Sequence, residues 1–224
     1  MARTRSRLAL CCLLLILWLV APAEAQYWRW SQPKPYHKAV VVVRASDGQG
    51  MRITTGTIIH FRGLCGVLTC AHGLTGQEAT VKLQDGRTVR ARCTVDKNGL
   101  DIGFVLIPCQ KHLPHIPVAW ASPQPGDTVE FVTFGGPETR LRHWLARVAG
   151  SRGTKQEYST YVVHGDSGGA ILNTKGELVG VQSYGIETVF GSYLRVPVYR
   201  GAGGECLPRI RSFLQRVLQR FGGS

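Results

Sequence analysis

The sequence has no C-x-x-C pair, and its cysteines and histidines form no cluster with the spacing of zinc ligands. This absence argues against a zinc- or cysteine-dependent hydrolase, and no metal or cofactor is expected. Acidic residues are scarce as well, because 14 Asp and Glu stand against 27 Lys and Arg. The net charge of +13 favours anionic partners such as acidic polysaccharide or a membrane surface. No basic run is interleaved with aromatic residues, so specific nucleic-acid binding is not expected, and a solubilising surface is the simpler interpretation.

The N-terminal apolar run is too short to span a bilayer. It covers residues 8–21, and a membrane helix needs about 18 residues or more. The run follows three arginines and precedes small residues that end at Ala25, which is the order of a secretory signal peptide. We therefore expect residues 1–25 to be cleaved and the mature chain to be secreted or periplasmic. The signal carries three arginines and one glutamate, so the mature chain keeps a net charge of about +11.

Five of the seven cysteines remain after the signal peptide. An odd number allows at most two disulfide bonds, and an exported chain meets the oxidising conditions in which they form. The spacing alone does not assign the pairs. The five residues are Cys65, Cys70, Cys93, Cys109 and Cys206.

Glycine is abundant, with 27 residues, and helical periodicity is rare. Short runs rich in β-branched residues, bounded by glycine turns, form two sets on either side of a proline-rich stretch at residues 112–126. This pattern predicts an all-β fold of two six-stranded antiparallel barrels. Apolar residues recur at helical spacing after Pro208, which predicts a short C-terminal α-helix. The expected barrels are residues 26–116 and 117–206, with the helix and tail at residues 207–224.

The stretch YVVHGDSGGAIL, residues 161–172, places a serine among glycines within an otherwise apolar strand pattern. A serine hydroxyl becomes a good nucleophile when a base removes its proton and donors receive the developing charge. Gly165 frees the backbone before Ser167, so that N–H groups can converge on an oxyanion. Gly168 and Gly169 remove side chains where substrate and neighbouring backbone approach. A glycine-rich turn without catalysis is the simpler alternative for this motif alone.

A base and its carboxylate partner are available elsewhere in the chain. His72 follows an apolar strand in VLTCAHGL, and Asp101 precedes one in LDIGFVLI. A buried aspartate needs a hydrogen-bond partner, and His72 would supply one. Asp96 is a weaker candidate for the same role. Taken singly, His72 could be a structural histidine and Asp101 a turn residue.

In this order, LTCAHG, LDIGFVL and GDSGGAI resemble the three catalytic blocks of the chymotrypsin-like (trypsin-like) serine peptidases, over roughly residues 55 to 200. The resemblance implies that His72 is the general base, Asp101 its orienting partner and Ser167 the nucleophile. It also implies an oxyanion hole at the amides of Gly165 and Ser167. The chain would be a secreted serine endopeptidase acting on proteins or peptides through an acyl-enzyme. The alternative is a catalytically silent domain of this family that binds anionic surfaces.

The resemblance also implies a substrate cleft. The strand VQSYG is similar to the one that pairs with the substrate backbone, and it places Ser183 beside the catalytic residues. The base of the primary pocket falls at Tyr161, followed by Val162, so no carboxylate is available there for a lysine or arginine of substrate. Five histidines outside the catalytic blocks are interpreted as structural or surface residues, although His164 also falls within the expected cleft: they are His60, His112, His115, His143 and His164. The full set of expected substrate-binding residues is Tyr161, Val162, His164, Ser183, Tyr184 and Gly185.

The chain departs from the digestive members of the family at several positions. Gly73 and Val163 stand where those members carry cysteines, and no Ile-Val-Gly-Gly start precedes the first strand. The pattern is closer to compact secreted bacterial members and to HtrA-type cores without a PDZ domain. In proteolytically activated members, the aspartate before the nucleophile pairs with a new N-terminus. The partner of Asp166 in this chain is therefore open.

Overall fold

The computed structural model describes residues 31–46, 48, 50–135, 140–153, 155–190 and 198–221. The expected signal peptide, residues 1–25, lies outside the described residues. In the part of the chain that is described, no helix combines the length and the apolar character needed to cross a membrane.

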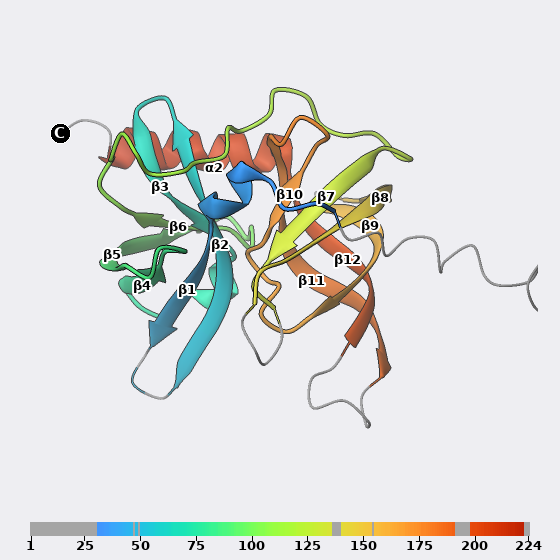
Figure 1. Cartoon of the computed structure of the whole chain (residues 1–224), viewed down its shortest axis with the longest axis horizontal. Coiled ribbons are helices and arrows are strands. Elements are labelled where there is room, and N and C mark those ends of the chain that lie inside the picture. Colours follow the sequence, from blue (N-terminus) through green and yellow to red (C-terminus); the bar gives the residue numbers. More distant parts are fainter. Residues whose placement is uncertain are drawn as a thin grey trace, which may run out of the picture.

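Twelve antiparallel strands close into two barrels that lie side by side (Figure 1). The first barrel has the strand order β1-β2-β3-β6-β5-β4, and the second has β10-β11-β12-β9-β8-β7. The predicted all-β fold of two six-stranded barrels is thus confirmed. The bounds in the first barrel are β1 Val40–Ser46, β2 Met51–Phe61, β3 Leu64–Thr69, β4 Glu78–Lys82, β5 Thr88–Val95 and β6 Gly103–Leu106. Those in the second are β7 Thr128–Thr133, β8 Arg142–Arg152, β9 Lys155–Val163, β10 Ala170–Leu172, β11 Leu178–Phe190 and β12 Val198–Cys206.

Among the described residues, two short 3₁₀ helices lie in the first half of the chain. The helix η2, Pro35–Ala39, leads into β1, and η3, Ala71–Gly73, follows β3. Gly66 in β3 shows why a glycine is needed inside a barrel. A Cβ atom there would lie 2.1 Å from the Phe104 ring, so glycine lets this aromatic residue pack against the strand.

The C-terminal helix α2, Leu207–Phe221, follows the last strand of the second barrel and packs into an apolar core that includes residues of the first (Figure 1). Its apolar face is buried, and its arginines lie mostly on the other face, as the helical spacing predicts. The predicted C-terminal helix is confirmed. The buried helix residues in this shared core are Ile210, Phe213, Leu214 and Val217.

The same core continues into the second barrel, so the barrels share an apolar interface. Val132, Leu172 and Val181 from the second barrel belong to one cluster with Val41 and Leu68 from the first. Burial of this contiguous apolar surface fixes the barrels relative to each other. Loops from the two barrels can therefore form one site.

One disulfide, Cys65–Cys109, joins β3 to the segment after β6. Cys70, Cys93 and Cys206 have free thiols. This bond is within the maximum of two that the cysteine count allows. Closure of the barrel brings the Cα atoms of Cys65 and Cys109 to 5.2 Å.

Candidate active site

His72 and Asp101 meet at the end of the first barrel that faces the second. His72 lies in η3, directly after β3, and Asp101 precedes β6, the strand that pairs with β3. The Asp101 carboxylate accepts two hydrogen bonds from the same residue. His72 Nδ1 lies 2.7 Å from Oδ2, and the His72 backbone N–H donates to Oδ1 over 2.9 Å. This two-point contact fixes both the ring and the main chain of His72.

Asp101 receives further support from the second barrel. The Ser183 hydroxyl donates to Oδ2, and the Asp101 backbone N–H donates to Glu205 Oε1 over 2.9 Å. Burial opposes ionisation of this carboxyl, but the hydrogen bonds from His72 and Ser183 outweigh it and lower the pKa of Asp101 to about 2. Asp101 is therefore a carboxylate at neutral pH. Asp96, the weaker sequence candidate, instead pairs with Arg216 of α2.

The other ring nitrogen of His72 lies beside a thiol. Cys70 Sγ is 3.6 Å from Nε2, and Cys70 is fully buried while the His72 side chain is 45% exposed. The hydrogen bond to Asp101, followed by the Cys70 contact, raises the pKa of His72 to about 10 against the opposing effect of burial. The imidazolium form is thus strongly favoured in this arrangement.

Ser167 projects from the turn between β9 and β10, on the second barrel. Gly165 and Gly168 flank it with φ angles of +92° and +83°, a region that favours glycine. A Cβ atom on Gly168 would lie 2.0 Å from the Thr55 carbonyl oxygen, so glycine permits this close backbone approach. The Ser167 hydroxyl points to the Ser183 carbonyl oxygen at 3.4 Å. Within the described residues it makes no hydrogen bond to His72.

Thr55, on β2 of the first barrel, holds this turn in place. Its backbone N–H donates to the Ser167 carbonyl over 2.9 Å, and its hydroxyl donates to the Gly165 carbonyl over 2.8 Å. The turn's carbonyls are thus fixed by the opposite barrel. Among the residues described, neither the Gly165 nor the Ser167 amide donates to a protein acceptor, so both N–H groups are available to an incoming oxyanion.

Asp166 is fully buried and pairs with Arg142 of β8. One guanidinium nitrogen of Arg142 lies 2.6 Å from each carboxylate oxygen. The Thr133 hydroxyl and the Val163 backbone N–H also donate to this carboxylate, over 2.6 and 2.8 Å. The residue before Ser167 is thus neutralised by a cation from within the fold.

The expected substrate-binding residues fall on β9, on the following turn and on β11. Tyr161 is half-buried, Val162 is 2% exposed within the second barrel's core, and His164 is exposed. Ser183 is buried in an irregularity of β11, where the register with β12 shifts between Gln182 and Tyr184. This bulge re-aims Ser183 towards Asp101. Tyr184 and Gly185 follow, half-buried, on the same strand.

Sequence patterns gave no sign of four residues that contact this site. Thr55 and Cys70 lie in the first barrel, and Arg142 and Glu205 in the second. Of these, Cys70 lies inside the block LTCAHG, two positions before His72, but the block gave no indication of its contact with the ring. The others lie in ordinary strand sequence, far along the chain from the groups that they contact.

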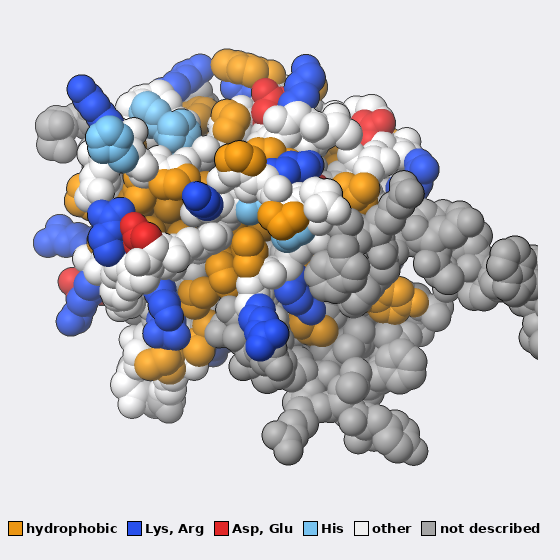
Figure 2. Space-filling view, in the orientation of Figure 1, with side chains coloured by type: hydrophobic (Ala, Val, Ile, Leu, Met, Phe, Trp, Pro, Cys, Tyr) orange, Lys and Arg blue, Asp and Glu red, His pale blue; other side chains and the backbone are white. Residues whose placement is uncertain are grey.

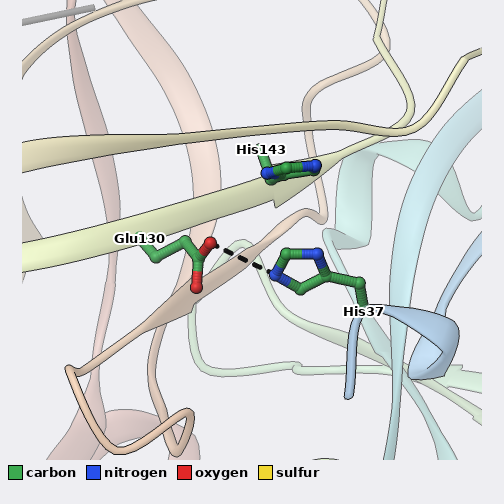
Figure 3. Close-up of side chains that lie close together, drawn as sticks. All are labelled: His37, Glu130 and His143. Atoms are coloured by element: carbon green, nitrogen blue, oxygen red, sulfur yellow. Dashed lines mark hydrogen bonds and ion pairs between the residues drawn. The ribbon is translucent and has the colours of Figure 1, made fainter. Parts of the chain in front are cut away.

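A second polar cluster joins η2 to β7 and β8: His37, Glu130 and His143 (Figure 3). Their ligand atoms lie within 4.8 Å of one another, a grouping that could hold a metal ion. Their hydrogen bonds argue otherwise. His37 Nδ1 accepts from the Lys34 backbone N–H, so the ring proton sits on Nε2 and is donated to Glu130 over 3.2 Å. A metal would have to displace this proton.

The Lys34 ammonium already neutralises Glu130 at 3.1 Å, and the Tyr36 hydroxyl donates to the same oxygen over 2.8 Å. Burial opposes the charge on Glu130, but bonds from His37 and its neighbours lower the pKa of Glu130 to about 2. The cluster therefore fits a polar anchor between the segment before β1 and the second barrel.

Comparisons with known proteins agree with this architecture. The family of the trypsin-like peptidase domain matches residues 54–181, more than half of the chain. No curated protein matched the sequence. Among solved structures, the chain is similar to a serine endoprotease from Yersinia pestis, with 23% identity and a TM-score of 0.67. That alignment covers 86% of this chain and 69% of the other.

The chain is also similar to the HtrA-type protease AlgW, solved with a tripeptide, with 17% identity and a TM-score of 0.65. This alignment covers 83% of this chain and 62% of AlgW, so AlgW extends beyond the part that the two structures share. At these identities the structures show a shared fold, and the expected resemblance to the trypsin-like serine peptidases is confirmed by the family match. The chain therefore belongs to the trypsin-like serine peptidases, a family of hydrolytic endopeptidases.

Proposed function

We propose that this chain is a secreted endopeptidase in which His72, Asp101 and Ser167 act as a catalytic triad. The observation that carries the proposal is the two-point contact between Asp101 and His72, at 2.7 and 2.9 Å, opposite the Ser167 turn. The ion pair between half-buried Arg142 and the fully buried Asp166 carboxylate supports the shape of that turn. A silent domain that only binds anionic surfaces would have no need for these contacts.

In the proposed mechanism, Ser167 Oγ turns from the Ser183 carbonyl towards His72 Nε2 and attacks the scissile carbonyl carbon. His72 takes the hydroxyl proton, and Asp101 stabilises the imidazolium without taking the proton itself. The amides of Gly165 and Ser167 donate to the oxyanion of the tetrahedral intermediate. His72 then gives the proton to the leaving amine, and water hydrolyses the acyl-enzyme by the same steps.

Covalent labelling tests the nucleophile. The mature chain should react with a fluorophosphonate probe and Ser167→Ala should not, while Ser159→Ala, at an exposed serine of β9, should label normally. His72→Ala should lower turnover by about 10⁴-fold, because the triad acts as a unit. Equal labelling of the parent and Ser167→Ala would contradict Ser167 as the nucleophile, and absence of labelling in both would favour the silent alternative.

We also propose that residues 1–25 are a signal peptide that directs export. The supporting observation is the sequence order of three arginines, an apolar run and small residues ending at Ala25. The mass of the protein recovered outside the cytoplasm tests this. A product that starts at Gln26 is expected, and a full-length product retained in the cell contradicts it.

A further inference from the structure

A groove of about 1340 Å³ runs along the first barrel, away from the Ser167 turn. Its lining residues run from Phe221 at the C-terminal end of α2, past β5 and β4, to Ser46 and Met51 at the ends of β1 and β2. Figure 1 shows how these elements are arranged. Five basic side chains and one acidic side chain line it, and Figure 2 shows Lys and Arg groups on this side of the molecule with few Asp or Glu. We call it the basic groove. Its charged lining residues are Arg44, Glu78, Arg90, Arg92, Lys97 and Arg220.

Strand register concentrates the arginines on one face. Arg44 of β1 pairs with Thr80 of β4, which pairs in turn with Arg90 of β5. Residues paired directly across strands point to the same side of a sheet, so Arg44 and Arg90 flank the short Thr80 side chain. Arg92 lies two residues beyond Arg90 and projects from the same face. Two strands therefore present three guanidinium groups around one small residue.

Most of this charge is not neutralised by the protein. Glu78 pairs with Arg90 at 2.6 Å. Within the described ranges, no carboxylate lies at ion-pair distance from Arg44, Arg92 or Lys97. The Nε atom of Arg44 is buried and has no hydrogen-bond partner. An unpaired buried donor is costly, and an anionic ligand in the groove would satisfy it.

The shape and lining of the basic groove select the class of ligand. Guanidinium groups bind carboxylate and sulfate oxygens in paired hydrogen bonds, and the cations here are spread along strands and a helix end. A chain with repeated negative charges therefore fits better than a single anion. Phe221 is the one aromatic residue in the lining, so the stacking surface of a single-strand nucleic-acid site is lacking. A flat bilayer would meet the rim before the concave lining.

We propose that the basic groove binds a linear sulfated or carboxylated polysaccharide. Leu74, Thr75 and Gly76 line the groove directly after the segment that carries His72, so the ligand would lie on the far side of that segment. The groove is separate from the Ser167 turn. Binding can therefore be measured without turnover, and its outcome is independent of the proposed peptidase activity.

The experiment titrates Ser167→Ala protein with a heparin decasaccharide in about 0.15 M salt, where exposed charges are screened. The test variant is Arg44→Gln/Arg92→Gln/Lys97→Gln. The matched control, Lys111→Gln/Lys175→Gln/Arg209→Gln, removes the same charge at exposed residues outside the groove. We expect the test variant to bind at least about tenfold more weakly, and the control to stay within about twofold of the parent.

Equal weakening by both variants would show that binding follows net charge, and it would overturn the assignment to the groove. Absence of decasaccharide binding by the parent would also overturn it. Tighter binding of single-stranded DNA or of phosphatidylserine vesicles, tested at matched charge, would replace polysaccharide with another class of partner. Arg92→Gln/Lys97→Gln serves as a second variant if loss of the partly buried Arg44 impairs folding, and it should still weaken binding.

Discussion

Cys70 Sγ lies 3.6 Å from Nε2 of His72, the nitrogen that must accept a proton from Ser167 in the proposed mechanism. The thiol is fully buried and cannot reach a substrate. The thiol is therefore a neighbour of the proposed base, and together with Asp101 it favours the protonated ring of His72.

The value of kcat/KM should therefore increase as the pH becomes alkaline. Below its pKa of about 10 the ring carries a proton and cannot act as a base, so kcat/KM should rise about tenfold per pH unit up to that pH. Cys70→Ala removes a contact that raises the pKa of His72, so the rising limb should move to lower pH and activity at pH 7 should increase. Profiles of kcat/KM between pH 6 and 11 measure both effects. Identical limbs in the parent and Cys70→Ala would contradict this role for the thiol.

Arg142 should be needed for both folding and reactivity of Ser167. Arg142→Met leaves the carboxylate of Asp166 buried without its counter-charge, which should cost about 3–5 kcal/mol of unfolding free energy. The double variant Arg142→Met/Asp166→Asn removes both charges and should recover part of this loss. Urea unfolding measures stability, and fluorophosphonate labelling reports on the turn. Labelling of Arg142→Met at the parental rate would show that the ion pair does not shape the site.

Glu205 should support Asp101 through its oxygen rather than its charge. Glu205 is fully buried and accepts the Asp101 backbone N–H, with Lys155 at 3.6 Å. The amide of Glu205→Gln keeps an acceptor in place and should retain most of kcat. Glu205→Leu leaves that N–H unpaired, which should cost about 1–3 kcal/mol of stability and lower kcat more than it changes KM. Steady-state kinetics and thermal unfolding compare the two variants, and equal losses would indicate that the charge matters instead.

The primary pocket should prefer an uncharged residue of small or medium size. Its expected base, Tyr161 and Val162, offers no carboxylate, and burying an unpaired cation costs several kcal/mol. Burial of the aliphatic part of a lysine or arginine side chain gains less free energy than this, at about 0.8 kcal/mol per methylene. Values of kcat/KM for peptides that differ at this residue test the preference. A tenfold or greater preference for Arg over Leu or Val would contradict it.

The fold class and the His72–Asp101 contact could be predicted because their signals are local. Glycine-bounded strand runs and helical spacing after Pro208 report on neighbours in sequence, and the motif order carried the resemblance. The partner of Asp166 could not be predicted. Arg142 is 24 positions away on an ordinary strand, and only barrel closure brings the two charges together.

The Glu205–Asp101 contact and the disulfide could not be predicted either, because both depend on how distant strands meet in the closed barrels. Glu205 lies 104 positions after Asp101, and no periodicity relates the two residues. Five cysteines allow many pairings, and the selection of Cys65–Cys109 depends on how β3 and β6 lie in the closed barrel.

The path of α2 has a consequence for the timing of folding. During synthesis the first barrel emerges early, but four apolar residues of its core belong to a helix that is made after the second barrel. Until α2 has emerged, the apolar cluster that contains Leu68 lacks these four side chains. We therefore expect the two barrels to reach their final packing only after the helix has been made, so that the end of the chain completes a core begun by its first strands.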